Sequence, residues 1–218
     1  MAITAIDQRC LSQMLVFVGD EIARHETELN GLDAAVGDGD HGITMRIGFQ
    51  AIRARLGQID PATPIDEILR ESGSAFLGAT GGAIGVVMGK MLMAGGKALE
   101  GVQEIRAPQF RLLLTSMETS VAANGKVKPG DRTILDAIHR AAAATKANDS
   151  GAEDLDAIVD RAASAAQDAA RSTADMLCRV GRASRLGNRV LGHPDPGATS
   201  FAVILRAMHD WIKSPSSG

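Results

Sequence analysis

Apolar residues recur every three or four positions along most of this 218-residue chain, and this spacing constrains the fold more than any other feature. In the first segment it places Leu11, Met14, Val18 and Ile22 on one face of a helix. The alternation of apolar and polar residues that is typical of a half-buried strand does not stand out anywhere. We therefore expect an all-α fold whose first helix covers about residues 4–30.

The same pattern predicts about eight helices, separated by loops that contain glycine or proline. The later helices are expected near residues 44–57, 65–77, 86–99, 108–125, 132–147, 152–180 and 198–212. Many of their residues are alanine or glycine, and small side chains let helix axes approach closely. We expect one domain over residues 4–213 and a flexible tail over 214–218.

Composition excludes several classes of function. A net charge of −3 and 3% aromatic residues argue against a nucleic-acid surface, and the sequence lacks an apolar run long enough to span a membrane. The N-terminal segment does not have the pattern of a secretory signal. The two cysteines, Cys10 and Cys178, are interpreted as small core residues in a reducing compartment. We therefore expect a cytoplasmic globular protein without a membrane span.

The stretch "GLDAAVGDGDHGITM", residues 31–45, is the most unusual part of the sequence. Its glycines at 37, 39 and 42 match G-x-G-x-x-G, but a dinucleotide-binding loop follows a strand, whereas a helix is predicted here. A second partial match, "GVVMGKM", has Ile84 where the first glycine of a Walker A loop belongs and Met91 where Ser or Thr belongs. Neither glycine motif is accepted.

The aspartates of this stretch favour a cation site. Asp33, Asp38 and Asp40 would repel one another in a tight turn unless a hard cation such as magnesium were bound. A helix that begins near residue 42 would offer free N–H groups to phosphate oxygens beside that cation. The alternative is that Asp38 or Asp40 only caps the helix. Three aspartates and His41 within nine residues favour the cation site.

Three other loops could line the same site. These are "GATGGAIG" (78–85), "NGKVKPGDRT" (124–133) and "GHPDPGATS" (192–200). Taken singly, tight helix packing or a turn followed by an N-cap would explain each of them. In an antiparallel bundle, however, the aspartate loop and these three loops would follow the first, third, fifth and seventh helices, and so lie at one end. The sequence thus predicts a site for a magnesium-bound polyphosphate on a bundle rim.

With these loops in place, the sequence resembles the nucleotide-binding (L) subunit of dihydroxyacetone kinase. The resemblance rests on "GLDAAVGDGDHGITM", "GGAIG", "NGKVKPGDRTILDA" and "GRASRLGNRVLGHPDPGATS", and it covers nearly the whole chain. It implies a closed barrel of eight antiparallel helices, with ADP or ATP and two magnesium ions at one end. It also implies a separate K-type subunit that holds the ketose covalently on its own histidine.

The resemblance also implies roles for individual residues. The metal ligands would be Asp33, Asp38 and Asp40. The nucleotide-binding residues would be His41, Gly42, Ile43, Thr44, Ala83, Ile84, Gly125, Ile134, Arg182, Asp195, Pro196 and Gly197. The chain departs from the family at Ile84, where serine is usual, at Thr44, where asparagine is usual, and at Arg185, where an aromatic residue is frequent.

The expected function is that of the nucleotide-binding subunit of a two-component kinase. Phosphate would pass to a short ketose on the K-type partner, either from exchanging Mg-ATP or from a bound ADP that is recharged. No catalytic residue is assigned, because His41 is expected to bind rather than to act as a base. The alternative is a non-catalytic magnesium-nucleotide sensor that docks on a regulatory protein. A phosphotransferase-system phosphoryl donor and a homodimer remain open as further partners.

Overall fold

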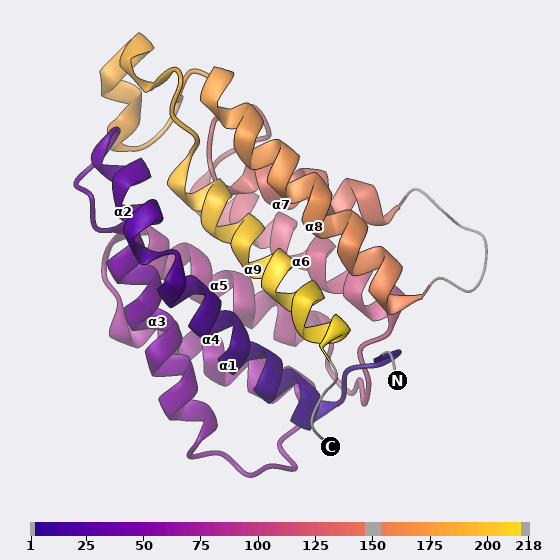
Figure 1. Ribbon diagram of the computed structural model, residues 1–218. Coiled ribbons are helices and arrows are strands. Elements are labelled where there is room, and N and C mark those ends of the chain that lie inside the picture. The colour runs from indigo at the N-terminus through magenta and orange to yellow at the C-terminus, as the bar shows by residue number, and fades with distance from the viewer. Residues whose placement is uncertain (1–2, 147–153, 215–218) are drawn as a thin grey trace.

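The computed structural model describes residues 3–146 and 154–214, and within them regular secondary structure is helical apart from one β-bridge between Ile6 and Ile105 (Figure 1). The α-helices are α1 (Gln8–Arg24), α2 (Glu26–Ala34), α3 (His41–Leu56), α4 (Ile65–Ala79), α5 (Gly82–Ala98), α6 (Ala107–Gly125), α7 (Ile134–Thr145), α8 (Leu155–Ser172) and α9 (Pro196–Lys213). Two 3-10 helices, η1 (Thr173–Asp175) and η2 (Arg182–Val190), lie between α8 and α9. The all-α prediction is confirmed. Residues 215–218 of the expected tail lie outside the described residues.

The long helices close into a barrel. From α3 to α9, each helix packs against the next one along the chain, and α1 packs against both α3 and α9. This last contact closes the ring (Figure 1). The short helix α2 lies outside the ring and packs mainly on the beginning of α3 at one end of the barrel. The chain therefore carries its connecting loops to two opposite ends.

Several helix boundaries differ from the sequence-based predictions. The expected first helix is broken at His25, whose ring Nδ1 lies 2.9 Å from the Glu21 carbonyl oxygen. The backbone N–H of His25 also contacts this carbonyl, so the side chain competes for a helical acceptor at the break. The helix expected over 152–180 ends at Ser172, and helix α5 begins four residues earlier than expected. Periodicity located the helices well but their ends poorly.

Close contact between α4 and α5 confirms the expected tight packing. A Cβ atom added at Gly73 would lie 2.5 Å from the Gly89 carbonyl oxygen, and one added at Gly89 would lie 2.8 Å from that of Gly73. Neither position could carry a larger side chain without a backbone shift. The apolar interior around this pair includes the fully buried Phe76 and Phe110. This pairing fixes the short turn from α4 to α5 at one end of the barrel.

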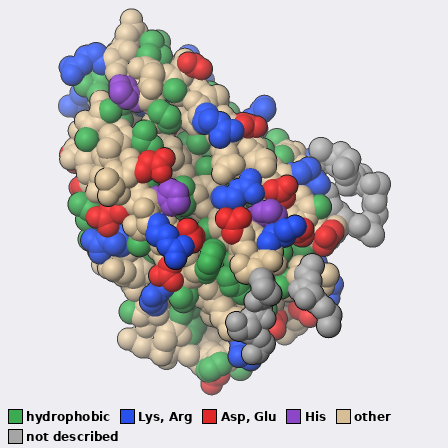
Figure 2. Space-filling model, in the orientation of Figure 1, with side chains coloured by type: hydrophobic (Ala, Val, Ile, Leu, Met, Phe, Trp, Pro, Cys, Tyr) green, Lys and Arg blue, Asp and Glu red, His purple; other side chains and the backbone are tan. Residues whose placement is uncertain are grey.

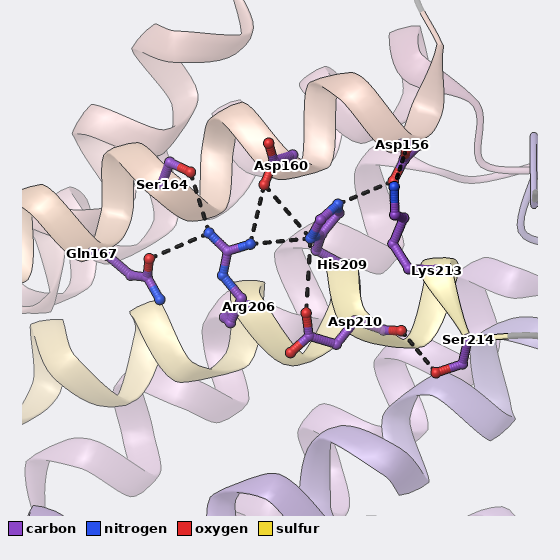
Figure 3. A network of polar contacts seen from close by, with 9 residues as sticks. All are labelled: Asp156, Asp160, Ser164, Gln167, Arg206, His209, Asp210, Lys213 and Ser214. Carbon is purple, nitrogen blue, oxygen red and sulfur yellow. Dashed lines mark hydrogen bonds and ion pairs between the residues drawn. The ribbon is translucent and has the colours of Figure 1, made fainter.

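A polar network joins α8 and α9 (Figure 3). Arg206 donates hydrogen bonds to Asp160 at 3.1 Å and to Gln167 at 3.3 Å. One turn further along α9, His209 Nε2 lies 3.0 Å from a carboxylate oxygen of Asp156. Because these contacts are directional, they fix the register of α9 against α8. The N-terminus of α9, at the other end of the helix, is thereby held in place.

The surface over α1, α8 and α9 carries acidic and basic side chains that are interspersed, not separated by sign (Figure 2). This mixture agrees with the small net charge of −3. Among the described helices, none combines the length and the apolar character needed to cross a bilayer.

Candidate functional site

The four predicted loops meet in one pocket of about 590 Å³ at one end of the barrel. Its wall is formed by residues drawn from five segments, within 33–44, 81–87, 132–134, 178–183 and 195–197. These segments include the starts of α3, α5, α7 and α9. The prediction that the loops share one end is therefore confirmed. Those loops did not include the wall at 178–183, where the family resemblance had named Arg182 alone.

The aspartate loop brings its three carboxylates together. Asp33, Asp38 and Asp40 can each offer an oxygen such that all three oxygens lie within 4.8 Å of one another. Asp33 comes from the end of α2, and its Oδ2 accepts hydrogen bonds from the backbone N–H groups of Gly39 at 2.9 Å and Asp40 at 3.0 Å. A Cβ at Gly37 would collide with the other carboxylate oxygen of Asp33. Glycine at position 37 therefore leaves this oxygen room.

Helix N-termini supply positive electrostatic potential to the pocket. Asp40 precedes α3 without a side-chain capping hydrogen bond, which argues against the capping alternative for this residue. Helix α5 begins after Gly81, which has no side chain to cap it. By contrast, Thr133 and Asp195 cap α7 and α9. In the first turn of α3, the Ile43 N–H donates to Asn30 Oδ1 at 3.2 Å. The remaining first-turn N–H groups of α3 and those of α5 can face an anion in the pocket.

His41 links the aspartate loop to the start of α9. Its side chain is buried, and its Nε2 lies 3.0 Å from Ser200 Oγ. Ser200 donates its own proton to the Gly197 carbonyl oxygen, so this arrangement assigns the donated hydrogen to His41 Nε2. Burial lowers the pKa of His41 to about 4, although Asp33 opposes this shift. The ring is therefore neutral near pH 7 and suited to holding two loops together.

Asp195 begins the last wall of the pocket. Its Oδ2 accepts the Ala198 N–H at 2.8 Å, and its own N–H donates to Thr173 Oγ1 at 2.8 Å. Burial raises the pKa of Asp195 to about 6, while the Ala198 N–H and the charge of Arg132 oppose the increase. Near neutral pH, the buried carboxylate of Asp195 is therefore charged, and its burial lowers the stability of the fold.

This cost predicts a pH-dependent stability difference. The folded-state pKa of Asp195 lies above the ordinary value of 3.8, so the fold binds the proton more tightly than the unfolded chain does. The contribution of Asp195 to stability should be lost as pH rises through about 6. Asp195→Asn keeps a capping oxygen without the charge. The melting temperature of Asp195→Asn minus that of wild type should therefore be larger at pH 7.5 than at pH 4.5. Both are measured without nucleotide or magnesium.

Asp7→Asn is the matched control, because Asp7 caps α1 through the same kind of hydrogen bond, to the Cys10 N–H at 2.7 Å. It reports any general effect of replacing a capping aspartate. If the two variants showed the same change between the two pH values, the ionisation of Asp195 would not be the cause.

The structure brings most of the predicted residues into the pocket wall. Those on the wall are Asp33, Asp38, Asp40, His41, Thr44, Ala83, Ile84, Ile134, Asp195, Pro196 and Gly197. Gly42 is buried against α2, where a Cβ would collide with the Glu26 carbonyl oxygen. Ile43 and Gly125 do not line the pocket. Ile43 is exposed on the first turn of α3, and Gly125 is the last residue of α6. The side chain of Arg182 lies outside the described residues.

Sequence reasoning missed other parts of the wall. Cys178 lines the pocket and is half-buried, so its interpretation as a core residue was wrong. Thr133, which was not singled out, caps α7. Arg132, which was not singled out, also lines the pocket but is only 1% exposed. No sequence signal distinguishes a buried arginine from a surface one in such a loop.

Comparison with known proteins agrees with this geometry. The family model described as DAK2 domain matches residues 35–210, which include most of the barrel and of the pocket wall. The chain belongs to the DAK2-domain family. Its match to the model includes Asp38 and Asp40, whereas Asp33 lies just before it.

Individual relatives of this DAK2-domain chain are kinases or kinase subunits. It is 31% identical over 217 residues to "PEP-dependent dihydroxyacetone kinase 2, ADP-binding subunit DhaL" of Listeria innocua, covering 98% of this chain and 99% of the relative. It is 32% identical over 190 residues to the corresponding "ADP-binding subunit DhaL" of Escherichia coli, covering 87% and 90%. The L-erythrulose kinase of Pectobacterium atrosepticum is 33% identical over 95% of this chain, which spans only 35% of that protein.

A solved structure shares the fold. The DAK2-domain chain superposes on the dihydroxyacetone kinase from C. freundii in complex with AMP-PNP and Mg²⁺ with a TM-score of 0.69 and 26% identity. The match covers 91% of this chain but only 33% of the C. freundii chain, so this chain spans about a third of that protein's length.

Proposed function

We propose that this chain is the nucleotide-binding subunit of a two-component kinase that phosphorylates a short ketose held by a K-type partner. The observation that carries the proposal is the pocket in which three clustered carboxylates lie beside the starts of α3 and α5, whose N-cap residues make no side-chain capping hydrogen bond. Two relatives that match almost end to end are named as ADP-binding subunits of dihydroxyacetone kinases, which supports the assignment.

The residues present fit magnesium. Asp33, Asp38 and Asp40 supply hard oxygen donors, and their oxygens are close enough to hold a metal ion together. Magnesium, when bound, would neutralise charge that develops on the transferring phosphate. The name of the C. freundii complex, which contains AMP-PNP and Mg²⁺, supports both ligands.

The chain's own residues would bind and orient the nucleotide. The first turns of α3 and α5 would direct N–H groups at phosphate oxygens, with Ala83 and Ile84 beside them. Ile134 and the 195–197 turn would form the opposite wall. Positioning of the phosphate would be the chain's main contribution to the rate, because no group here is placed as a covalent catalyst.

Phosphoryl transfer distinguishes this proposal from the sensor alternative. The chain is incubated with Mg-ATP, a K-type subunit and a panel of short ketoses, and sugar phosphate is measured. The kinase proposal requires product with at least one ketose. Nucleotide binding without any transfer would favour the sensor.

Whether the nucleotide exchanges is a separate question. A chain that retains ADP through purification and extended dialysis would use it as a resident cofactor, to be recharged by a phosphotransferase-system protein. A chain that releases it would use ATP as an exchanging substrate.

Ile84 offers a test of the phosphate wall. It is half-buried on the first turn of α5, and serine is the residue that the family resemblance led us to expect there. Ile84→Ser should strengthen Mg-ADP binding by about 0.5–1.5 kcal/mol, the net value of one hydrogen bond. Calorimetry measures the change, and Ile84→Ala serves as the control that removes the same apolar contacts. If Ile84→Ser bound no better than Ile84→Ala, the hydroxyl would not reach the phosphate.

A further inference from the structure

Arg132 is an unusual residue in the loop that precedes α7. Its backbone has a left-handed conformation, with φ of 62°, which non-glycine residues rarely adopt. Its guanidinium reaches away from its own loop: Nε donates to the Thr173 carbonyl oxygen at 3.2 Å, and Nη2 donates to those of His193 at 2.6 Å and Val190 at 3.4 Å. One buried side chain therefore binds three carbonyls from a distant part of the sequence.

These carbonyls lie at the two ends of one segment. Thr173 begins η1, Val190 ends η2 and His193 follows it, so residues 173–193 leave the barrel and return to the same guanidinium. The backbone bond from Gly192 N to the Ala174 carbonyl oxygen, 2.9 Å, also joins the two ends. Between them lies the pocket wall that includes Cys178 and Gly181.

A buried guanidinium is costly unless its hydrogen bonds compensate. Within the described residues, Arg132 Nη1 is buried without a hydrogen-bond partner. The positive charge of Arg132 nevertheless lowers the pKa of the neighbouring Asp195, whereas the negative charge of Asp136 raises that pKa. An uncharged apolar side chain would leave the three carbonyls without their common donor, so the fork of donors is what joins the ends of the segment.

We propose that Arg132 is a positioning residue of the nucleotide site: it clamps both ends of residues 173–193 and so holds the 178–183 wall and Asp195 beside the starts of α7 and α9. This proposal rests on the proposed function for its purpose. The clamp itself can be tested without nucleotide.

Cys178 reports on the clamp because it lies inside the segment. The chain has two cysteines, so Cys10→Ser leaves Cys178 as the single thiol. In this background, without nucleotide or magnesium, Arg132→Met should increase the rate of Cys178 labelling by a thiol reagent about tenfold, as expected for easier local opening. Arg111→Met is the matched control. Arg111 lies near the start of α6, at the opposite end of the barrel from the pocket, and also donates to a backbone carbonyl oxygen, that of Thr145.

Equal labelling rates in Arg132→Met and Arg111→Met would overturn the proposal. If Arg132→Met failed to fold, as judged by circular dichroism, Arg132→Lys would decide. A lysine keeps the charge but cannot span three carbonyls with one nitrogen. Labelling of Arg132→Lys should therefore exceed that of wild type, and an equal rate would overturn the clamp. Because labelling is read without nucleotide, this result is independent of whether the chain is a kinase subunit.

The pH dependence of Mg-ADP affinity separates the charge from the clamp. Asp195 lines the pocket, so its ionisation near pH 6 should produce a step in Mg-ADP affinity. Removing the positive charge in Arg132→Met should raise the pKa of Asp195 further and move this step to higher pH. Arg132→Lys should return that step to its wild-type position while labelling stays fast. A step that did not move in Arg132→Met would contradict the influence of Arg132 on Asp195, since a purely structural loss would weaken binding equally at every pH.

Discussion

Replacing Asp38 with alanine should weaken Mg-ADP binding by at least about 100-fold, more than is typical for loss of a residue that only supports a metal ligand. Asp38 contributes one of the three clustered oxygens, and two remaining carboxylates would hold the cation poorly. The side chain is exposed and outside the apolar core, so helix content should stay unchanged. Calorimetry at fixed magnesium measures the affinity, and circular dichroism measures the helix content.

Asp168→Ala is the matched control for charge. Asp168 lies on α8 with a side chain that is 71% exposed, and its ion pair with Arg171 is of a kind that contributes little to stability. It removes the same charge without touching the cluster. Equal nucleotide affinity in the two variants would mean that the aspartate loop does not hold the metal.

The chain by itself should form essentially no sugar phosphate from Mg-ATP and any short ketose. Most polar groups of the pocket wall belong to the aspartate cluster or to the helix starts and their caps, and among the described residues no lysine lines that wall. A ketose would have to be positioned by the K-type partner, and loss of positioning is costly in a bimolecular transfer. Product measured by mass spectrometry should appear only when the partner is added.

Adding the partner to Asp38→Ala tests the same idea from the other side. If the metal-bound phosphate is delivered from this chain, that mixture should remain inactive while the Asp168→Ala mixture is active. Robust sugar phosphate from the wild-type chain without any partner would overturn the two-subunit account.

The sequence predicted those features that depend on spacing and residue type. Helical period identified the barrel helices, since each buries an apolar stripe along its whole length. The aspartate cluster was predictable because like charges in one short loop require compensation. The order of the loops was enough to place them at one end of the barrel, which the common pocket confirms.

What the sequence could not reveal depends on contacts between distant segments. At the break, the Glu21 carbonyl oxygen contacts both the ring and the backbone N–H of His25, a local arrangement that leaves no mark in periodicity. The burial of Arg132 depends on carbonyls about 40 to 60 residues away, and the 178–183 wall depends on that clamp. The metal-binding and nucleotide-binding roles of all the site residues, Ile43, Gly125 and Arg182 among them, stay predictions from family resemblance.

The most direct test of the central claim is calorimetric titration of the wild-type chain with ADP, first in magnesium and then in excess chelator. The account predicts binding in magnesium and its near disappearance in chelator, because three clustered carboxylates would repel the phosphates without a cation. Unchanged affinity in chelator would contradict it.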